Sequence, residues 1–241
     1  ALDQLVARHE VLRTTYVSHG EHAIQRIAPA APVAITRISL DAALTDAALE
    51  TLIADEARQP FRLADEAPLR VSLLQLGAID HVVLFTLHHI ASDGWSMGLV
   101  IDEFVTAYAA TAHGLPLQST KLPVQYADYA HWQRERLQGE VLQQQLDYWR
   151  TQLSGIPSVH SLPLDHLRPA QQVFSGARLS RTLDSACRQR LEQLARSENA
   201  TLFMLVLTAF ALLLGGWSGE DDIVMGTPVA GRTHRDLEGL V

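Results

Sequence analysis

Two adjacent histidines and an aspartate mark the stretch of this chain best suited to chemistry. His88 and His89 end an apolar run, and Asp93 and Gly94 follow within the next five residues. Because side chains alternate across a strand, at most one of the two imidazoles faces a given cleft. A histidine side chain has an ordinary pKa of about 6.5, so it exchanges protons near neutral pH and suits acid–base work. The pattern indicates a candidate site built around one imidazole, with Asp93 close enough to orient the loop.

Other interpretations of single residues in this region stay open. A histidine at a strand end is more often a packed core residue than a catalyst. A metal site would need a further ligand, and none is spaced to close the shell around the histidines. Ser92 and Ser96 lack the G-x-S-x-G turn that exposes a nucleophilic serine. Cys187 falls among apolar residues of an amphipathic helix, which favours packing.

The segments on either side of the histidines are expected to hold them at one end of a sheet. Residues 82–87 are apolar with hardly any alternation, which predicts a central strand covered on both faces. After Gly94, apolar residues at helical spacing predict a helix that reaches Tyr108. The first amides of such a helix are unpaired and favour developing negative charge.

The rest of the chain predicts a mixed α/β protein. Strands are expected over residues 11–17, 22–27, 33–38, 71–76, 81–88, 174–183 and 223–225. Helices are expected over residues 1–9, 45–57, 125–137, 140–153, 185–197 and 201–216. Glycine, serine and proline in residues 154–170 indicate a linker, so we expect a domain boundary near residue 160. The longest apolar run, 202–214, is too short to cross a bilayer and predicts a buried helix.

The composition excludes several classes of protein. With 241 residues, 47% hydrophobic and 19% charged, the chain has the make-up of a globular protein and not of a disordered or fibrous one. A formal net charge of −8 argues against a nucleic-acid ligand. The one cysteine excludes an internal disulfide and fits a reducing compartment, so we expect a cytoplasmic protein. The chain opens at Ala1 as if inside a helix, and we expect it to be an excerpt of a longer protein.

The stretch from Leu87 to Ser96 resembles the His-His-x-x-x-Asp-Gly motif of condensation domains of nonribosomal peptide synthetases. Four more stretches resemble motifs of that family and occur in the family's order: 8–16 (RHEVLRTTY), 60–70 (PFRL with PLR), 126–132 (YADYAHW) and 226–232 (GTPVAGR). One such motif would be weak evidence, since related acyltransferases share His-x-x-x-Asp. Five in the correct order, across essentially the whole chain, make a specific resemblance.

The resemblance implies a chloramphenicol-acetyltransferase-like α/β fold, an α+β mixed-sheet architecture of two lobes with a tunnel between them. Residues 1–160 would form a nearly complete first lobe that holds the histidine motif. Residues 161–241 would form a linker and the beginning of the second lobe. The family's opening motif and the motifs that complete the second lobe are absent from these 241 residues, so we expect the fragment alone to be inactive.

The resemblance also implies amide formation. The amine of an acceptor on a downstream carrier domain attacks a donor thioester on the phosphopantetheine arm of an upstream carrier domain, and His89 is the family's catalytic candidate. An α-amine with a pKa of about 7.7–8.0 is partly neutral already. His89 would therefore either take the proton once attack has made the nitrogen acidic, or align the amine by a hydrogen bond. The amide of Gly94 is expected to face the thioester oxygen.

Three residues, Asp93, Arg13 and His88, are expected to support His89. By resemblance, the Asp93 carboxylate pairs with Arg13 and ties the loop to the strand after the first helix, and its loss would leave Arg13 buried and unpaired. His88 is expected to pack on the opposite side of the strand. Arg232, which follows a Gly-rich loop, is expected either to help join the lobes or to be exposed.

No cofactor and no metal are expected in the domain itself. The partners implied are upstream and downstream carrier domains and an adjacent adenylation domain, with no nucleic acid and no membrane. Residues 95–99 (WSMGL) resemble condensation domains that accept an L-configured donor. An epimerisation domain, a carrier-independent acyltransferase and a catalytically inactive carrier-docking module are the alternatives.

Overall fold

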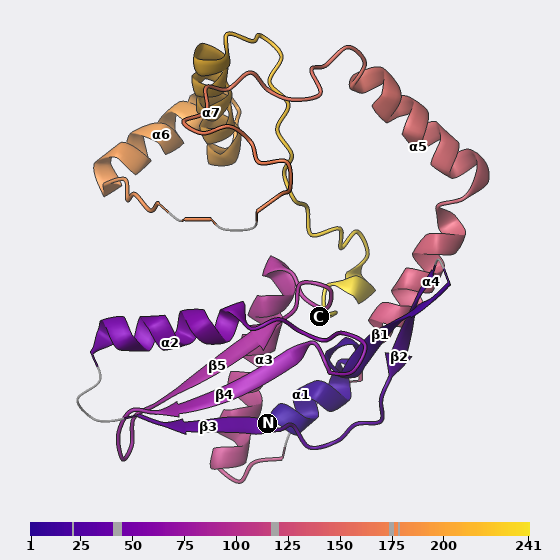
Figure 1. Ribbon diagram of the computed structural model, residues 1–241, viewed down its shortest axis with the longest axis vertical. Helices are drawn as coiled ribbons and strands as arrows, with labels where there is room; N and C mark the ends of the chain where they lie inside the picture. Colours follow the sequence, from indigo (N-terminus) through magenta and orange to yellow (C-terminus); the bar gives the residue numbers. More distant parts are fainter. Residues whose placement is uncertain (21, 41–44, 117–120, 174–175, 178) are drawn as a thin grey trace. The chain divides into compact units, whose positions relative to one another are not determined.

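The computed structural model describes residues 1–20, 22–40, 45–116, 121–173, 176–177 and 179–241 (Figure 1). Its helices are α1 (Leu2–Arg8), η1 (Glu10–Arg13), α2 (Asp46–Arg58), α3 (Gly94–Ala112), α4 (Tyr126–Arg136), α5 (Gly139–Gln152), α6 (Ser185–Ser197), α7 (Leu202–Ser218) and η2 (Arg235–Leu237). Its strands are β1 (Thr14–His19), β2 (His22–Ile27), β3 (Ile35–Ser39), β4 (Leu69–Gln75) and β5 (His81–Leu87). The chain divides into two compact units, residues 1–143 with 229–241, and residues 144–228. The boundary expected near residue 160 lies inside the second unit, and the division into lobes stays a prediction.

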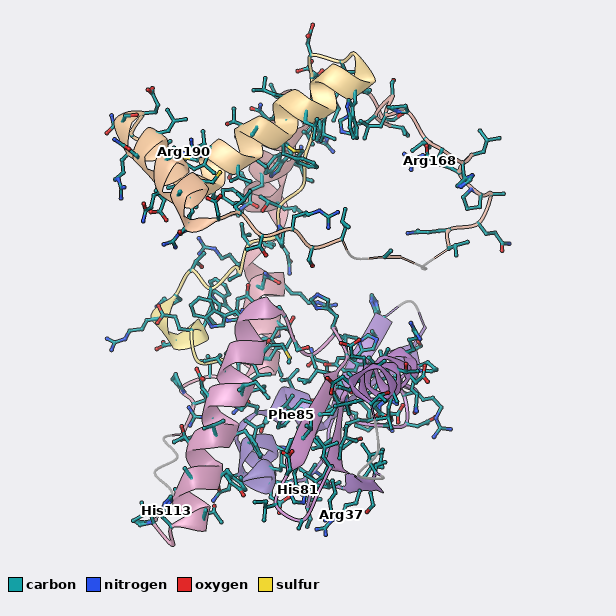
Figure 2. The ribbon with its side chains drawn as sticks, turned by 90° about the vertical axis from the view of Figure 1, so that its left-hand side faces the viewer. Arg37, His81, Phe85, His113, Arg168 and Arg190 are labelled. Atoms are coloured by element: carbon teal, nitrogen blue, oxygen red, sulfur yellow. The ribbon has the colours of Figure 1, made fainter. Side chains whose placement is uncertain are left out.

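The first unit is built on a mixed sheet in the order β3-β4-β5. β4 runs parallel to β3 and antiparallel to β5, and a separate antiparallel ribbon joins β1 to β2. β4 is the central strand and buries Val71, Ser72 and Leu74. The expectation that residues 82–87 form the central strand is wrong, because β5 has β4 as its one neighbour among the described strands. α2 and α3 lie on opposite faces of the sheet (Figures 1 and 2), but no residue of β5 is buried and Val83 is 37% exposed, so the expected burial on both faces is not observed.

The face of the sheet toward α3 carries the core that anchors the histidine loop. Phe85 points from β5 toward α3, where its ring lies edge-on to Phe104 with centroids 5.0 Å apart (Figure 2). A buried apolar cluster continues from there through Val100 of α3 and includes Ala91 of the loop itself. Burying one valine or leucine of this cluster contributes about 1.5–3 kcal/mol, and Ala91 packs the loop against the same cluster.

A buried polar contact fixes α1 against α3. His9 is 1% exposed, and its Nε2 lies 2.9 Å from the carboxylate of Glu103. Arg8 donates to the other oxygen of that carboxylate at 3.1 Å. Burial would raise the pKa of Glu103, but the hydrogen bond and charge of His9 and the charge of Arg8 lower it overall. Glu103 is therefore held ionised where the two helices meet.

Three expected strands differ from the structure. Val11 and Leu12 lie in the helical turn η1, because both side chains are buried and a strand would turn neighbouring side chains to opposite faces. Residues 223–225 form no strand, and unit 144–228 holds no other described strand to accept their hydrogen bonds. The expected strand 174–183 falls partly on residues 174–175 and 178, which lie outside the described residues, and its described remainder is not strand.

The second unit contains a helix whose environment differs from expectation. The predicted helix at 201–216 is confirmed as α7, but the prediction that it is buried is wrong, because no residue of α7 is buried. A helix that is apolar on all sides is buried only if other elements pack around it, and α6 packs against only part of α7. Within the described ranges no single helix meets the length and hydropathy needed to cross a bilayer, and the pair α6 and α7 would do so only across a 99° bend.

An ion pair in the second unit joins His160 to Glu220, which follows the end of α7. His160 Nδ1 lies 3.2 Å from the Glu220 carboxylate, and its Nε2 lies 2.8 Å from the Val224 carbonyl. Both neighbours only accept, so the ring fills both contacts as the doubly protonated imidazolium. The hydrogen bond to the Val224 carbonyl and, to a smaller extent, the contact with Glu220 raise the pKa of His160 above its usual range. The hydrogen bond from the Ser161 hydroxyl and, to a smaller extent, the contact with His160 lower the pKa of Glu220.

The pH dependence of stability tests this ion pair. The stability that His160 contributes is complete below pH 6.5 and is lost as the pH rises through its raised folded-state pKa. The stability that Glu220 contributes is complete above pH 4.5 and is lost as the pH falls through its lowered folded-state pKa. Glu220→Gln should therefore lower the thermal midpoint most between pH 4.5 and pH 6.5. Asp222→Asn, an exposed neutralisation nearby, is the control. Equal losses for the two variants at all pH values would contradict the assignment.

Candidate active site

The loop between β5 and α3 is held by contacts of His88. The His88 amide donates to the Pro68 carbonyl at 2.9 Å, and its Nδ1 accepts from the Ile90 amide at 2.9 Å. The imidazole lies edge-on to Phe61, with ring centroids 5.7 Å apart. Because Nδ1 accepts, the neutral ring carries its hydrogen on Nε2. His88 is thus bound into the loop that leads to its neighbour.

His89 is oriented by one hydrogen bond and is exposed on its other side. Its Nδ1 lies 2.6 Å from the Ser92 carbonyl. A carbonyl only accepts, so Nδ1 donates, and the neutral imidazole has an unprotonated Nε2 with a free lone pair. The structure gives Nε2 no partner among the residues it describes. A ring fixed at Nδ1 and open at Nε2 is arranged to accept a proton or a hydrogen bond.

A cavity of about 340 Å³ opens beside His89. Its wall is formed by the loop from His89 to Asp93, by the α4 residues Tyr126, Tyr129 and Gln133, and by parts of residues 230–241. All these residues belong to the unit 1–143 with 229–241. The residues needed for acid–base chemistry and a space for a ligand therefore occur together in that unit.

Asp93 caps the helix that follows the loop. Its Oδ1 accepts from the Ser96 amide at 2.8 Å and from the Ser96 hydroxyl at 2.9 Å, and its own amide donates to that hydroxyl at 2.6 Å. This reciprocal pair is a capping box, which satisfies amides at the start of α3 that have no partner within the helix. Ser96 is completely buried, so the box is rigid.

The second oxygen of Asp93 binds an arginine from the far end of the chain. Arg232 Nη1 lies 3.0 Å from Asp93 Oδ2, and Nη2 donates to the Leu240 carbonyl at 2.9 Å. Trp95 adds a parallel link, since its Nε1 donates to the Glu238 carbonyl at 2.9 Å. Burial would raise the pKa of Asp93, but the hydrogen bonds of Ser96 and the charge of Arg232 lower it overall.

The expected pair between Asp93 and Arg13 is wrong. Arg13 donates from Nε to the Val6 carbonyl at 3.2 Å and from Nη1 to the Ala28 carbonyl, and its Nη2 lies 3.3 Å from Glu10. Its guanidinium is therefore satisfied by groups near it in the sequence. The partner of Asp93 is Arg232, 139 residues away, and this pairing has no signal in local periodicity. The sequence contains one indication of this pairing, which is that Arg232 ends the Gly-rich motif of residues 226–232.

Gly94 lies at the first position of α3 and is exposed. A Cβ at this position would have no atom within 4 Å, so neither packing nor backbone strain within the chain requires glycine here. The described residues contain no group of three or more side chains placed to hold a metal ion. The role of the Gly94 amide toward a thioester oxygen stays a prediction.

Gln125 is a supporting residue that sequence reasoning missed. Its side-chain oxygen accepts from the Glu10 amide at 3.1 Å, and its amide nitrogen donates to the Arg8 carbonyl at 2.9 Å. Asp128 accepts from the Gln125 backbone amide at 2.8 Å and so caps α4. These bonds fix the helix that forms one wall of the cavity, and a polar residue just before the Tyr126 motif was the only sequence signal.

Asp93→Ala removes a helix cap and the partner of Arg232 together. We expect the free energy of unfolding to fall by about 2 kcal/mol, with about 1 kcal/mol from the cap and about 1 kcal/mol from the ion pair, which water partly screens. Urea unfolding of Asp93→Ala, Arg232→Ala and the double variant measures the coupling between the two side chains. Arg13→Ala is the matched control and should couple to Asp93→Ala by less than about 0.5 kcal/mol. A stronger coupling to Arg13 than to Arg232 would overturn the assignment.

The orientation of His89 predicts its tautomer. Long-range proton–nitrogen NMR spectra of histidine-labelled protein, recorded where the rings are neutral, should show His89 protonated at Nδ1. His9 is the internal comparison: its Nε2 donates to Glu103, so the neutral ring should show the opposite tautomer, protonated at Nε2. A His89 signal typical of the Nε2–H tautomer would contradict the hydrogen bond to Ser92.

The comparisons with known proteins cover the whole chain. The family model described as Condensation domain matches residues 1–241. The chain is 43% identical over 98% of its length to a linear gramicidin synthase of Brevibacillus parabrevis, and 40% identical over its full length to phosphinothricin tripeptide synthetase PhsC of Streptomyces viridochromogenes. It spans 5% and 22% of these two proteins.

Solved structures share the fold. The X-domain from teicoplanin biosynthesis matches all of the chain with a TM-score of 0.86 at 33% identity, and the chain covers 54% of that structure. The same X-domain in complex with OxyB gives a TM-score of 0.84. The family model and these relatives confirm the family that the sequence resembled and the mixed α/β fold. The chain belongs to the condensation domain family of nonribosomal peptide synthetases.

Proposed function

We propose that this chain carries the histidine site of a condensation domain that forms an amide bond between two carrier-bound substrates. The observation that carries this proposal is the exposed imidazole of His89, fixed at Nδ1 and free at Nε2 beside a cavity of about 340 Å³. Its membership of the condensation family and its similarity to a tripeptide synthetase support the same reaction class.

The proposed reaction needs one nucleophile, one leaving group and one proton acceptor. The lone pair of a neutral acceptor amine forms a C–N bond to the thioester carbonyl carbon, and the C–S bond then breaks. The proton that the nitrogen loses passes to His89 Nε2 and then to the departing thiolate, so the donor carrier is left with a free thiol. A histidine that only aligns the amine by accepting its N–H bond would use the same geometry.

The neighbours of His89 act on it indirectly in this proposal. Asp93 and His88 position the loop, and Arg13 supports the turn from which β1 starts. The Gly94 amide, at the start of α3, polarises the thioester carbonyl, because its helix position leaves it without a partner within the helix. The substrates arrive on phosphopantetheine arms of carrier domains upstream and downstream, beside an adenylation domain, and the domain itself needs no cofactor.

The donor is proposed to be L-configured. The support is the sequence of residues 95–99, in which Trp95 directly follows the glycine of the motif. Trp95 also bonds to the Glu238 carbonyl, so its side chain has a structural role whatever the donor. An epimerisation domain of the same family remains the alternative for this site.

A docking module is a second candidate function. The observation in its favour is the similarity to the X-domain from teicoplanin biosynthesis, which was solved in complex with OxyB. A docking module has no use for a histidine held in one tautomer beside a cavity, so the geometry of His89 favours catalysis.

The test uses the complete synthetase that contains this domain, with its two carriers loaded with L-aminoacyl groups. We expect a dipeptidyl group on the downstream carrier, and a loss of about 100-fold or more in its rate of formation for His89→Ala. His113→Ala, which removes an exposed imidazole at the end of α3, is the matched control.

Each other outcome points to a different function. Exchange of the donor α-proton without peptide formation would favour epimerisation. Carrier or partner-enzyme binding with neither reaction would favour the docking module. Equal rates for wild type and His89→Ala would contradict the role of His89, and a D-configured donor used in preference to its L-isomer would contradict the donor type alone.

A further inference from the structure

We propose that Tyr129 is a second substrate-binding residue of this site and donates a hydrogen bond from its phenol to the carbonyl oxygen of the donor thioester. This inference rests on the proposed function, which it deepens by naming a side chain that donates to the acyl carbonyl in addition to the Gly94 amide. Tyr129 and His89 line the same cavity but come from different elements, α4 and the loop before α3.

The ring of Tyr129 is held on several sides. It is half-buried and packs against the buried cluster of Leu122, Leu237 and Leu240. Its centroid lies 6.1 Å from that of Tyr126 and 5.9 Å from that of Trp132, so neighbouring rings of α4 flank it along the helix. A ring fixed in this way brings its hydroxyl to one place in the cavity, which is what a preorganised donor requires.

The direction of the hydrogen bond at the phenol follows from its neighbour. Gln133, one turn further along α4, donates from Nε2 to the Tyr129 oxygen at 2.9 Å. The phenol oxygen therefore accepts from the chain, and its own hydrogen has no acceptor among the described residues. Gln133 lines the cavity as well, so the free O–H lies on the cavity side of the helix.

The chemistry of the cavity then has two complementary groups. His89 Nε2 can only accept when the ring is neutral, and the Tyr129 hydroxyl is left to donate. A thioester carbonyl gains negative charge as the amine attacks, so it takes the donor, whereas the amine N–H takes the acceptor. Arg232 also lines the cavity, but its Nη atoms are bound to Asp93 and the Leu240 carbonyl, and its unpaired Nε is buried.

Substitutions at positions 129 and 133 separate this role from a structural one. Tyr129→Phe removes only the hydroxyl, and we expect the single-turnover rate of dipeptide formation in the complete synthetase to fall at least about 10-fold, without a change in thermal midpoint. Gln133→Glu should give a similar loss, because a carboxylate accepts the phenol hydrogen and takes the donor away from the substrate. Gln133→Lys keeps a donor toward the phenol and should retain most of the rate. Tyr108→Phe, the same change on an exposed ring of α3, is the control.

A spectroscopic measurement tests the bond without peptide formation. The synthetase is loaded with a donor thioester labelled with carbon-13 at the carbonyl, and no acceptor is supplied. The carbonyl stretch should lie at lower frequency in wild type than in Tyr129→Phe and Gln133→Glu, since a donated hydrogen bond weakens the C=O bond. If wild type forms no peptide, the proposed function fails, while the infrared shift still decides the role of Tyr129. Unchanged frequencies in Tyr129→Phe would overturn the inference.

Discussion

The site depends on the hydrogen bonds and the ion pair that the Asp93 carboxylate forms. One oxygen caps α3 through Ser96, and the other binds Arg232, which also holds the Leu240 carbonyl. One side chain thus joins the loop that follows β5, the start of α3 and a residue 139 positions away. Those bonds also hold the pKa of Asp93 below its ordinary range, so the carboxylate stays ionised, and the contacts persist, to lower pH than they would with an unperturbed aspartate.

The orientation of His89 is a consequence of this arrangement. The capping box fixes the backbone on the C-terminal side of Ser92, and the contacts of His88 fix the other end of the loop. The Ser92 carbonyl is therefore a stationary acceptor for Nδ1, and Nε2 is left to face a ligand. Asp93 thus acts on the imidazole indirectly, because it helps to fix the carbonyl that leaves Nε2 as the free nitrogen.

The sequence predicted local structure well and long-range contacts poorly. The helices α2 to α7 and the strands β4 and β5 follow from periodicity and capping residues, and they lie within a few residues of their expected bounds. The neighbour of Asp93 depends on which cation the folded chain brings near, so neither spacing nor residue type could separate Arg13 from Arg232. The edge position of β5 was hidden for a related reason, since an apolar run does not report how many strands pair with it. The hydroxyl of Tyr129 likewise became a candidate only once α4 was seen beside His89.

The most direct test of the central claim is a crystal structure of the complete condensation domain with a stable amide analogue that links donor and acceptor groups. The account predicts the acceptor nitrogen within about 3.2 Å of His89 Nε2, with Asp93 still bound to Arg232. An acceptor nitrogen held by another side chain, with the His89 ring turned away from it, would contradict the account.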